Sequence, residues 1–202
     1  MNLFLTIDLE EYFHSTFLQP YVKKKIPRAH IQVEYILKTL NKFNSKSTFF
    51  VVSEWAQNNQ KLLKEIYSEG HEIAAHTHTH PVLTNLTKKE VYEEIYKSKV
   101  ILSEIINDNI YGFRCPNFAM PNNLFEILSE LNFKYDSSLC KSNLHFLSKK
   151  NYRNFTDIKE IPIISNIFPS GGGFMRFLPK IIFNNFVLNK KNCIIYIHPW
   201  DM

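Results

Sequence analysis

The chain has 202 residues, of which 45% are hydrophobic and 21% are charged. These proportions are typical of one globular domain with a sizeable core, and they exclude a mainly disordered chain. The formal net charge is +5, but the basic residues are scattered and Lys23-Lys24-Lys25 is the only tight run. We therefore expect a basic surface that can attract anionic ligands, and no nucleic acid among the partners.

Segments with the periodicity of strands and helices alternate along most of the chain. The expected strands are residues 3–7, 47–52, 72–75, 111–114, 133–135, 160–164 and 193–197, and the expected helices are residues 30–43, 61–69 and 122–131. Thr87 and Glu90 form a capping-box pattern that predicts the start of a further helix, which ends near Ile106. Gly70 suits the position after a helix. This order favours a parallel α/β sheet or barrel in a single domain spanning residues 1–202.

The three cysteines, Cys115, Cys140 and Cys193, lie far apart and form no CxxC pair. This pattern argues against a disulfide framework and fits reduced, buried thiols. The first residues lack the pattern of a signal peptide, and no stretch approaches the roughly 20 apolar residues of a membrane span. We therefore expect a cytoplasmic protein with no integral membrane segment.

Ionisable side chains follow five of the expected strands. They are Asp8 and Glu10 after the first, His76, His78 and His80 after the third, then Arg114, Asp136 and His198. In α/β barrels the reactive residues lie at the carboxyl ends of the strands. The shared position predicts that these groups converge on one site.

The strongest signal is His76-Thr77-His78-Thr79-His80. Two imidazoles four residues apart on a helical turn can share one metal ion, whereas an extended strand would place all three on one side. We expect His78 to lie outside the coordination shell. A polar, histidine-rich loop is the alternative without a metal.

A catalytic zinc site needs a third protein ligand, and Asp8, Glu10 and Glu11 are natural sources of it. Asp8 and Glu10 are two residues apart, so a strand end presents both on the same side. One carboxylate can bind the metal while the other takes a proton from the bound water. An acidic turn without catalytic function is the alternative.

Two further motifs carry single reactive groups. Arg114 could hold a catalytic carboxylate in its ionised form, and we expect Cys115 beside it to be a packed neighbour. His198 is suited to protonate a leaving amine because its ordinary pKa lies near neutrality. Trp200 could stack on a sugar face or pack in the core.

Together these motifs resemble the NodB-type polysaccharide deacetylases of carbohydrate esterase family 4. The segments that carry the likeness are Thr6-Ile7-Asp8, His76-Thr77-His78-Thr79-His80, Arg114-Cys115-Pro116 and Ile195-Tyr196-Ile197-His198. Others resemble the branch associated with exopolysaccharide export and exosortase gene clusters. They are Asp8-Leu9-Glu10-Glu11-Tyr12-Phe13, Tyr135-Asp136-Ser137-Ser138, Gly171-Gly172-Gly173-Phe174-Met175-Arg176 and His198-Pro199-Trp200-Asp201.

The resemblance implies a distorted (β/α)-barrel and a divalent metal such as zinc. It also implies a hydrolysis reaction in which water is consumed and N-acetyl groups are removed from an acetylated amino-sugar glycan. Carried over by position, Asp8 would be the catalytic base, Arg114 would orient it, and His198 would be the acid. His76 and His80 would bind the metal.

Leu9 stands where the family has a second aspartate, so the carboxylate ligand would be Glu10, with Glu11 as the alternative. The chain ends at Met202, whereas relatives of this branch usually continue. We therefore expect the barrel to be incomplete at its C-terminal end.

The remaining expected roles concern the substrate and the acid. The residues expected near the substrate are Tyr12, Asn117, Phe118 and Trp200, with a backbone N–H near Asn117 or Phe118 as an oxyanion donor. Asp136 or Glu160 could orient His198. Two alternatives stay open for the function, namely hydrolysis of a cyclic or linear amide outside carbohydrates and non-catalytic sugar binding.

Overall fold

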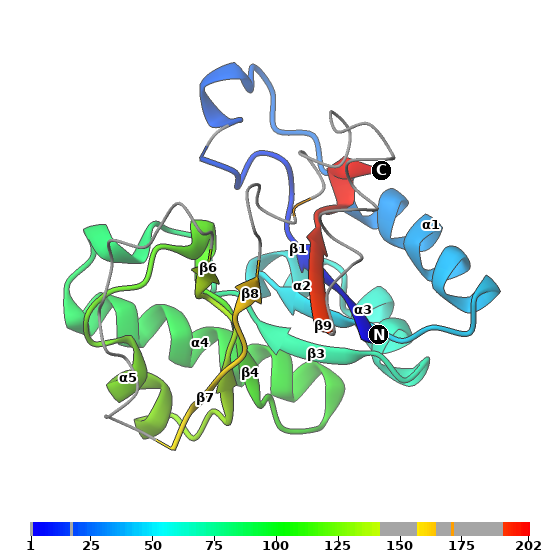
Figure 1. Ribbon diagram of the computed structural model, residues 1–202. Helices are drawn as coiled ribbons and strands as arrows, with labels where there is room; N and C mark the ends of the chain where they lie inside the picture. Colours follow the sequence, from blue (N-terminus) through cyan, green and yellow to red (C-terminus); the bar gives the residue numbers. More distant parts are fainter. Residues whose placement is uncertain (1, 17, 142–156, 165–170, 172–191) are drawn as a thin grey trace.

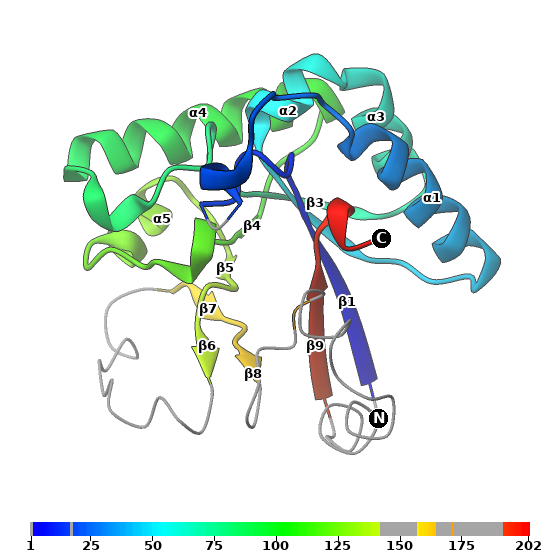
Figure 2. The same cartoon turned by 90° about the horizontal axis from the view of Figure 1, so that it is seen from above.

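The computed structural model describes residues 2–16, 18–141, 157–164, 171 and 192–202. Within these ranges, parallel strands form a seven-stranded sheet in the order β7-β5-β4-β3-β2-β1-β9. The sheet curls into an open half-barrel, and the helices cover its outer face (Figures 1 and 2). The expected distorted (β/α)-barrel is confirmed in this form.

The strands of the main sheet agree with those expected from the sequence, apart from their bounds, whereas β6 was not expected. The sheet contains β1 (Asn2–Leu9), β2 (Thr48–Val51), β3 (Glu72–Ala75), β4 (Gly112–Phe113), β5 (Tyr135–Asp136), β7 (Lys159–Glu160) and β9 (Asn192–Ile197). A second, two-stranded sheet pairs β6 (Cys140–Lys141) with β8 (Ile163–Ile164). The expected strand over residues 160–164 is thus divided between β7 and β8.

All four expected helices are present. The helices are α1 (Ala29–Lys42), α2 (Ser53–Asn58), α3 (Gln60–Ser68), α4 (Lys88–Ile106) and α5 (Leu124–Glu130). Short 3₁₀ turns are η1 (Gln19–Tyr21), η2 (Leu83–Asn85), η3 (Pro116–Phe118) and η6 (Pro199–Asp201). Thr87 and Glu90 form the expected capping box at the start of α4. The helix α2 was not predicted, because its six residues are too few to show helical periodicity.

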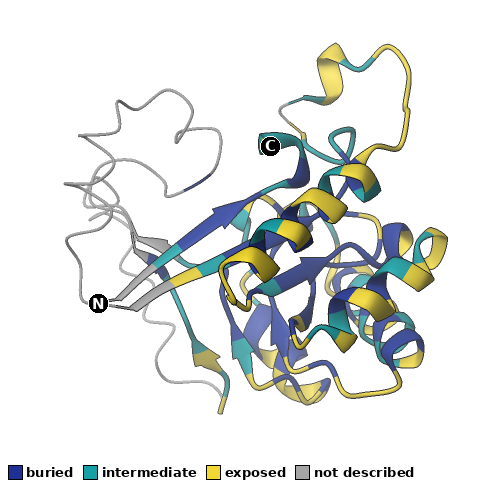
Figure 3. Cartoon of the chain, turned by 90° about the vertical axis from the view of Figure 1, so that its right-hand side faces the viewer, coloured by how far each residue is buried: buried dark blue, intermediate teal, exposed yellow. Residues whose placement is uncertain are grey.

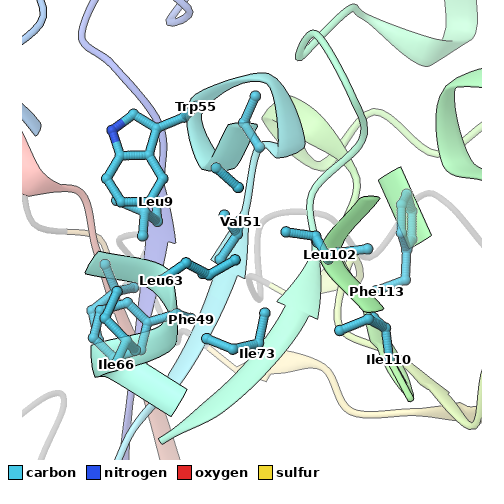
Figure 4. Close-up of a cluster of buried hydrophobic side chains, with 14 of the residues drawn as sticks. Leu9, Phe49, Val51, Trp55, Leu63, Ile66, Ile73, Leu102, Ile110 and Phe113 are labelled. Atoms are coloured by element: carbon cyan, nitrogen blue, oxygen red, sulfur yellow. The ribbon is translucent and has the colours of Figure 1, made fainter. Parts of the chain in front are cut away.

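The core lies between the outer face of the sheet and the helices. Phe49 and Val51 of β2 pack in one cluster with Leu63 and Ile66 of α3 and Leu102 of α4 (Figure 4). Burying each such side chain contributes about 1.5–3 kcal/mol to folding. Figure 3 shows the resulting pattern, with buried residues along the strands and exposed residues on the outer faces of the helices. None of the helices in the described ranges is both long and apolar enough to cross a membrane.

The register of the strands brings their carboxyl ends to one edge. Ile7 of β1 pairs with Ile197 of β9, and Ala75 of β3 pairs with Phe113 of β4. The residues that directly follow these pairs therefore share one edge of the half-barrel. The expected convergence of the strand ends is confirmed.

Candidate metal centre and catalytic residues

Three side chains from two strand ends form a buried group that could hold a metal ion. Glu10 follows β1, and His76 and His80 belong to the loop after β3. One ligand atom from each residue lies within 4.8 Å of the others, and all three residues are at most 5% exposed. One carboxylate and two imidazoles leave room for a water or substrate oxygen in a tetrahedral shell.

His76 is held in the form that a metal requires. Its Nδ1 lies 2.8 Å from the backbone oxygen of Arg114. A carbonyl oxygen can only accept, so Nδ1 carries the hydrogen and Nε2 keeps a free lone pair. Burial is the largest of the effects that lower the pKa of His76 to about 3, which keeps the ring neutral.

The contact between Glu10 and His80 also fits a shared cation. The Oε2 atom of Glu10 lies 2.9 Å from Nε2 of His80, but without the geometry of a hydrogen bond. Oε2 is buried, and no donor among the described residues satisfies it. Because a buried carboxylate oxygen without a partner is costly, a cation bound here would supply the missing interaction.

The loop that carries the two histidines has a conformation that the sequence did not predict. It is neither a helical turn nor an extended strand, because Thr77 and His80 have positive φ values of 65° and 61°. Glu94 of α4 accepts hydrogen bonds from the backbone N–H groups of His78 and Thr79 and from the Thr79 hydroxyl, at 2.9–3.0 Å. Thr77 accepts another from the N–H of His80. These four bonds compensate for the strained backbone.

His78 and Glu11 lie outside the group of three. Nδ1 of His78 is 2.8 Å from the hydroxyl of Ser53 at the start of α2. The Glu11 carboxylate accepts hydrogen bonds from the backbone N–H groups of Arg28 and Ala29, where α1 begins. Glu10 is thus the carboxylate that faces the two imidazoles, and Glu11 caps a helix.

Asp8 forms a buried ion pair with Arg114. Its Oδ1 accepts from Nη1 of Arg114 at 2.5 Å, and the same guanidinium donates to Thr6 and to both the hydroxyl and the backbone oxygen of Ser137. Burial raises the pKa of Asp8, but Arg114, His76 and other neighbours outweigh it and bring the pKa below its ordinary value. Asp8 is therefore an anion at neutral pH.

His198, which follows β9, lies next to Glu10. Its Nε2 lies 3.6 Å from Oε1 of Glu10, and its Nδ1 lies 3.1 Å from Oδ2 of Asp201. The ring of Trp200 stacks on the ring of His198 with centroids 4.4 Å apart. Burial lowers the pKa of His198, but Asp201, Asp8 and Glu10 raise it above its ordinary value.

The expected orienting role of Asp136 or Glu160 is corrected in favour of Asp201. Asp136 accepts from the N–H and hydroxyl of Ser138, and Glu160 accepts from the N–H of Leu139. The two carboxyl groups face each other on paired strands. Burial, followed by the charge of Asp136, raises the pKa of Glu160 to about 10, so the pair shares a proton.

The residues expected near the substrate have local partners. The hydroxyl of Tyr12 donates to the backbone oxygen of Lys24 and accepts from the N–H of Ile26. Asn117 and Phe118 both have positive φ, a strained conformation that is frequent at functional sites. The Phe118 N–H already donates to Cys115, which leaves the Asn117 N–H as the oxyanion donor to test.

Sequence reasoning missed His14. Its ring stacks on that of His80 at 6.2 Å, and its Nε2 lies 3.7 Å from Glu54. Burial is the main cause that lowers the pKa of His14 to about 4. The available signal was a histidine three residues after Glu11.

Two other expectations concern the cysteines and the glycine motif. Cys115 is fully buried, as expected for a packed neighbour. Gly171 pairs with Tyr196, and a Cβ there would lie 2.5 Å from the tyrosine ring. Residues 172–176 of the glycine motif lie outside the described residues.

Fold and site together define an α/β half-barrel with a buried carboxylate–histidine group at its carboxyl edge. Residues 28–135, more than half of the chain, match the family model for polysaccharide deacetylases. The chain belongs to this family. Its likeness to the exopolysaccharide-associated branch stays a prediction.

Individual relatives agree with this assignment. The peptidoglycan-N-acetylglucosamine deacetylase of Bacillus cereus is 38% identical over 86 residues, which are 43% of this chain and 29% of that protein. A family 4 carbohydrate esterase from Streptomyces lividans superposes with a TM-score of 0.64 at 15% identity, covering 99% of this chain and 80% of that one. A Bacillus anthracis pseudoenzyme of the family gives a TM-score of 0.64 at 16% identity, covering 98% and 54%.

The Glu94 contacts predict a role in metal affinity. Replacing Glu94 with alanine removes three hydrogen bonds from the loop that carries His76 and His80. We expect zinc affinity to fall about 10–100-fold, as for other groups that position metal ligands. Competitive titration against a chromogenic chelator measures the change. Glu93→Ala, one residue away on an exposed face, is the control, and equal affinities of the two variants would contradict the role.

The Asp136–Glu160 pair predicts how stability depends on pH. The pKa of Glu160 is about 10 in the folded protein and 4.5 ordinarily, so the folded state keeps a proton that the unfolded state loses. The stabilisation is complete below the lower value and is lost as the pH rises toward the higher one. Relative to Glu160→Gln, the free energy of unfolding of the wild type should fall by up to about 1.4 kcal/mol for each unit that the pH rises.

Urea unfolding at pH 5, 7 and 9 tests this prediction. Glu104→Gln, on the exposed side of α4, is the matched control and should show the wild-type slope. Identical pH slopes for the wild type and Glu160→Gln would show that the pair holds no extra proton.

Proposed function

We propose that this chain is a metal-dependent hydrolase that removes N-acetyl groups from an amino sugar in a polysaccharide or glycan precursor. The observation that carries the proposal is the meeting of Glu10, His76 and His80 beside an ionised Asp8, with His198 next to Glu10. Membership of the polysaccharide deacetylase family supports the substrate class.

The residues present suit a divalent metal. Glu10, His76 and His80 would hold it, and zinc is our choice among the ions that accept nitrogen and oxygen ligands. When bound, such an ion polarises a carbonyl group and makes water acidic enough to lose a proton near neutral pH.

Asp8 is proposed as the base. Arg114 holds its carboxylate in place and keeps it ionised, so that one oxygen is free to take the proton of the attacking water. Arg114 itself is fully buried, and its guanidinium donates further hydrogen bonds to Thr6 and Ser137. These contacts restrict the movement of the Asp8–Arg114 ion pair.

His198 is proposed as the acid. The Asp201 carboxylate accepts a hydrogen bond from Nδ1 of His198. Nε2 of His198 is therefore the nitrogen that faces the site and can protonate the departing amine. Neighbouring carboxylates raise its pKa, which favours the protonated form that this step requires. Stacking on Trp200 fixes the plane of the ring.

A non-catalytic, sugar-binding role is the second candidate, because the Bacillus anthracis protein of similar fold is described as a pseudoenzyme. The retained Asp8, His76, His80 and His198 favour the enzyme. Hydrolysis of a non-carbohydrate amide would differ from the proposed reaction only in its substrate.

The matched region spans less than a third of the Bacillus cereus relative. The organisation of this chain as a single domain and its cytoplasmic location stay predictions.

An acetate-release assay on N-acetylglucosamine oligomers, with small cyclic amides in parallel, tests the proposed function. The wild type loaded with zinc should release acetate from the oligomers. Asp8→Asn should keep the metal and lose about 10²–10⁴-fold in turnover, because the base is removed. His76→Ala should lose the metal, measured as zinc per chain.

Asp108→Asn is the control for Asp8→Asn, since Asp108 also accepts a side-chain hydrogen bond but lies at the end of α4, exposed. It should keep full activity. Undiminished acetate release by Asp8→Asn, or wild-type zinc content in His76→Ala, would refute the scheme.

A further inference from the structure

A small cavity lies next to the candidate site, on the side of α1. Its volume is about 230 Å³, and it is lined by residues of the loop after β1, the start of α1 and the C-terminal turn η6: Glu11, Tyr12, Arg28, Ala29, Gln32, Pro199 and Trp200. Figure 1 shows η6 beside α1, close to the C-terminus. Ligand pockets usually reach about 300–1,000 Å³, so this cavity suits one sugar unit.

Trp200 joins this cavity to the proposed acid. One wall of the cavity is Trp200, whose ring stacks on that of His198, and His198 in turn lies 3.6 Å from Glu10. Glu11, which follows Glu10 in the chain, forms another wall. A glycan with its acetylated unit at Glu10 and His198 therefore places a neighbouring unit in this cavity.

The walls of the cavity carry polar groups that suit a sugar. The Glu11 carboxylate is 3% exposed, and both its oxygens accept from the start of α1, so its charge is compensated. The Oε1 atom of Gln32 is buried, and none of the described residues donates to it. A sugar hydroxyl is a suitable donor for that oxygen.

The charge beside the cavity is positive. Arg28 is exposed, and no carboxylate side chain in the described ranges forms an ion pair with its guanidinium. The hydroxyl of Tyr12 bonds to the backbone at Lys24 and Ile26, which holds the basic run Lys23-Lys24-Lys25 against the same loop. Arg28 is therefore an uncompensated cation at the rim, with a basic segment behind it.

We propose that this cavity is a subsite for an anionic sugar unit, bearing a carboxylate or a phosphate, that flanks the acetylated unit of the substrate. Arg28 binds the anion, because its planar guanidinium matches both groups. Gln32 accepts from a sugar hydroxyl, and Trp200 covers the sugar face. The proposal rests on the proposed deacetylation and adds that the substrate is an acidic glycan.

The test compares three oligosaccharides of equal length. One alternates glucuronic acid with N-acetylglucosamine, the second is neutral N-acetylglucosamine, and the third carries a phosphomonoester on the flanking unit. The wild type should prefer one of the two acidic compounds by kcat/KM, and the better one identifies the anion. Arg28→Gln should reduce that preference about tenfold, as expected for the loss of one charged hydrogen bond.

Lys61→Gln is the matched control, because Lys61 is an exposed cation on α3, away from the cavity. It should leave the preference unchanged. An equal loss in Arg28→Gln and Lys61→Gln would mean that net charge alone attracts the glycan, and the subsite would be rejected. A wild type without preference for either acidic compound would reject it as well.

Binding separates this proposal from the proposed function. The chain has two tryptophans, and Trp55 is buried at 3% exposure, so Trp200 is the one at the cavity. Acidic oligosaccharides should change the tryptophan fluorescence of the wild type, more weakly that of Arg28→Gln, and not that of Trp200→Phe. If no compound releases acetate, the deacetylase function is refuted, but this fluorescence pattern would still support the subsite. Equal fluorescence responses of the wild type and both variants would refute the subsite.

Discussion

The buried Arg114 connects the parts on which the site depends. Its guanidinium bonds to Asp8 and Thr6 of β1 and to Ser137 after β5, while its backbone oxygen fixes the ring of His76. Removing one partner of such a buried pair typically costs about 3–5 kcal/mol, because the other charge is left uncompensated. The same contacts that hold β1, β4 and β5 in register thus keep the proposed base ionised and one proposed metal ligand in the correct tautomer.

Much of the fold could be predicted, because strand and helix periods are local properties of the sequence. The positions of Glu10, His76 and His198 after strands were sufficient to predict that they meet, since parallel strands end at one edge. The conformation of the loop from His76 to His80 could not be predicted. Positive φ at Thr77 and His80 is uncommon outside glycine, and the hydrogen bonds that compensate for it come largely from Glu94, which is distant in sequence.

The residues that support the site were harder to find for a related reason. Asp201 contacts His198 across one turn, a local pattern that could have been recognised in the sequence. The proton shared by Asp136 and Glu160 depends instead on the register of β5 and β7, which no local pattern reveals. In the sequence, Glu94 is likewise one of several acidic residues on α4. Its role follows only from the contact that the structure shows with the loop from His76 to His80.

The central claim is that Glu10, His76 and His80 bind one metal ion together, and anomalous diffraction from zinc-soaked crystals tests it directly. We expect one strong peak within bonding distance of an oxygen of Glu10 and one nitrogen from each histidine, at about 2.0–2.2 Å. A peak elsewhere, or an intact fold with no peak between these three side chains, would contradict the account.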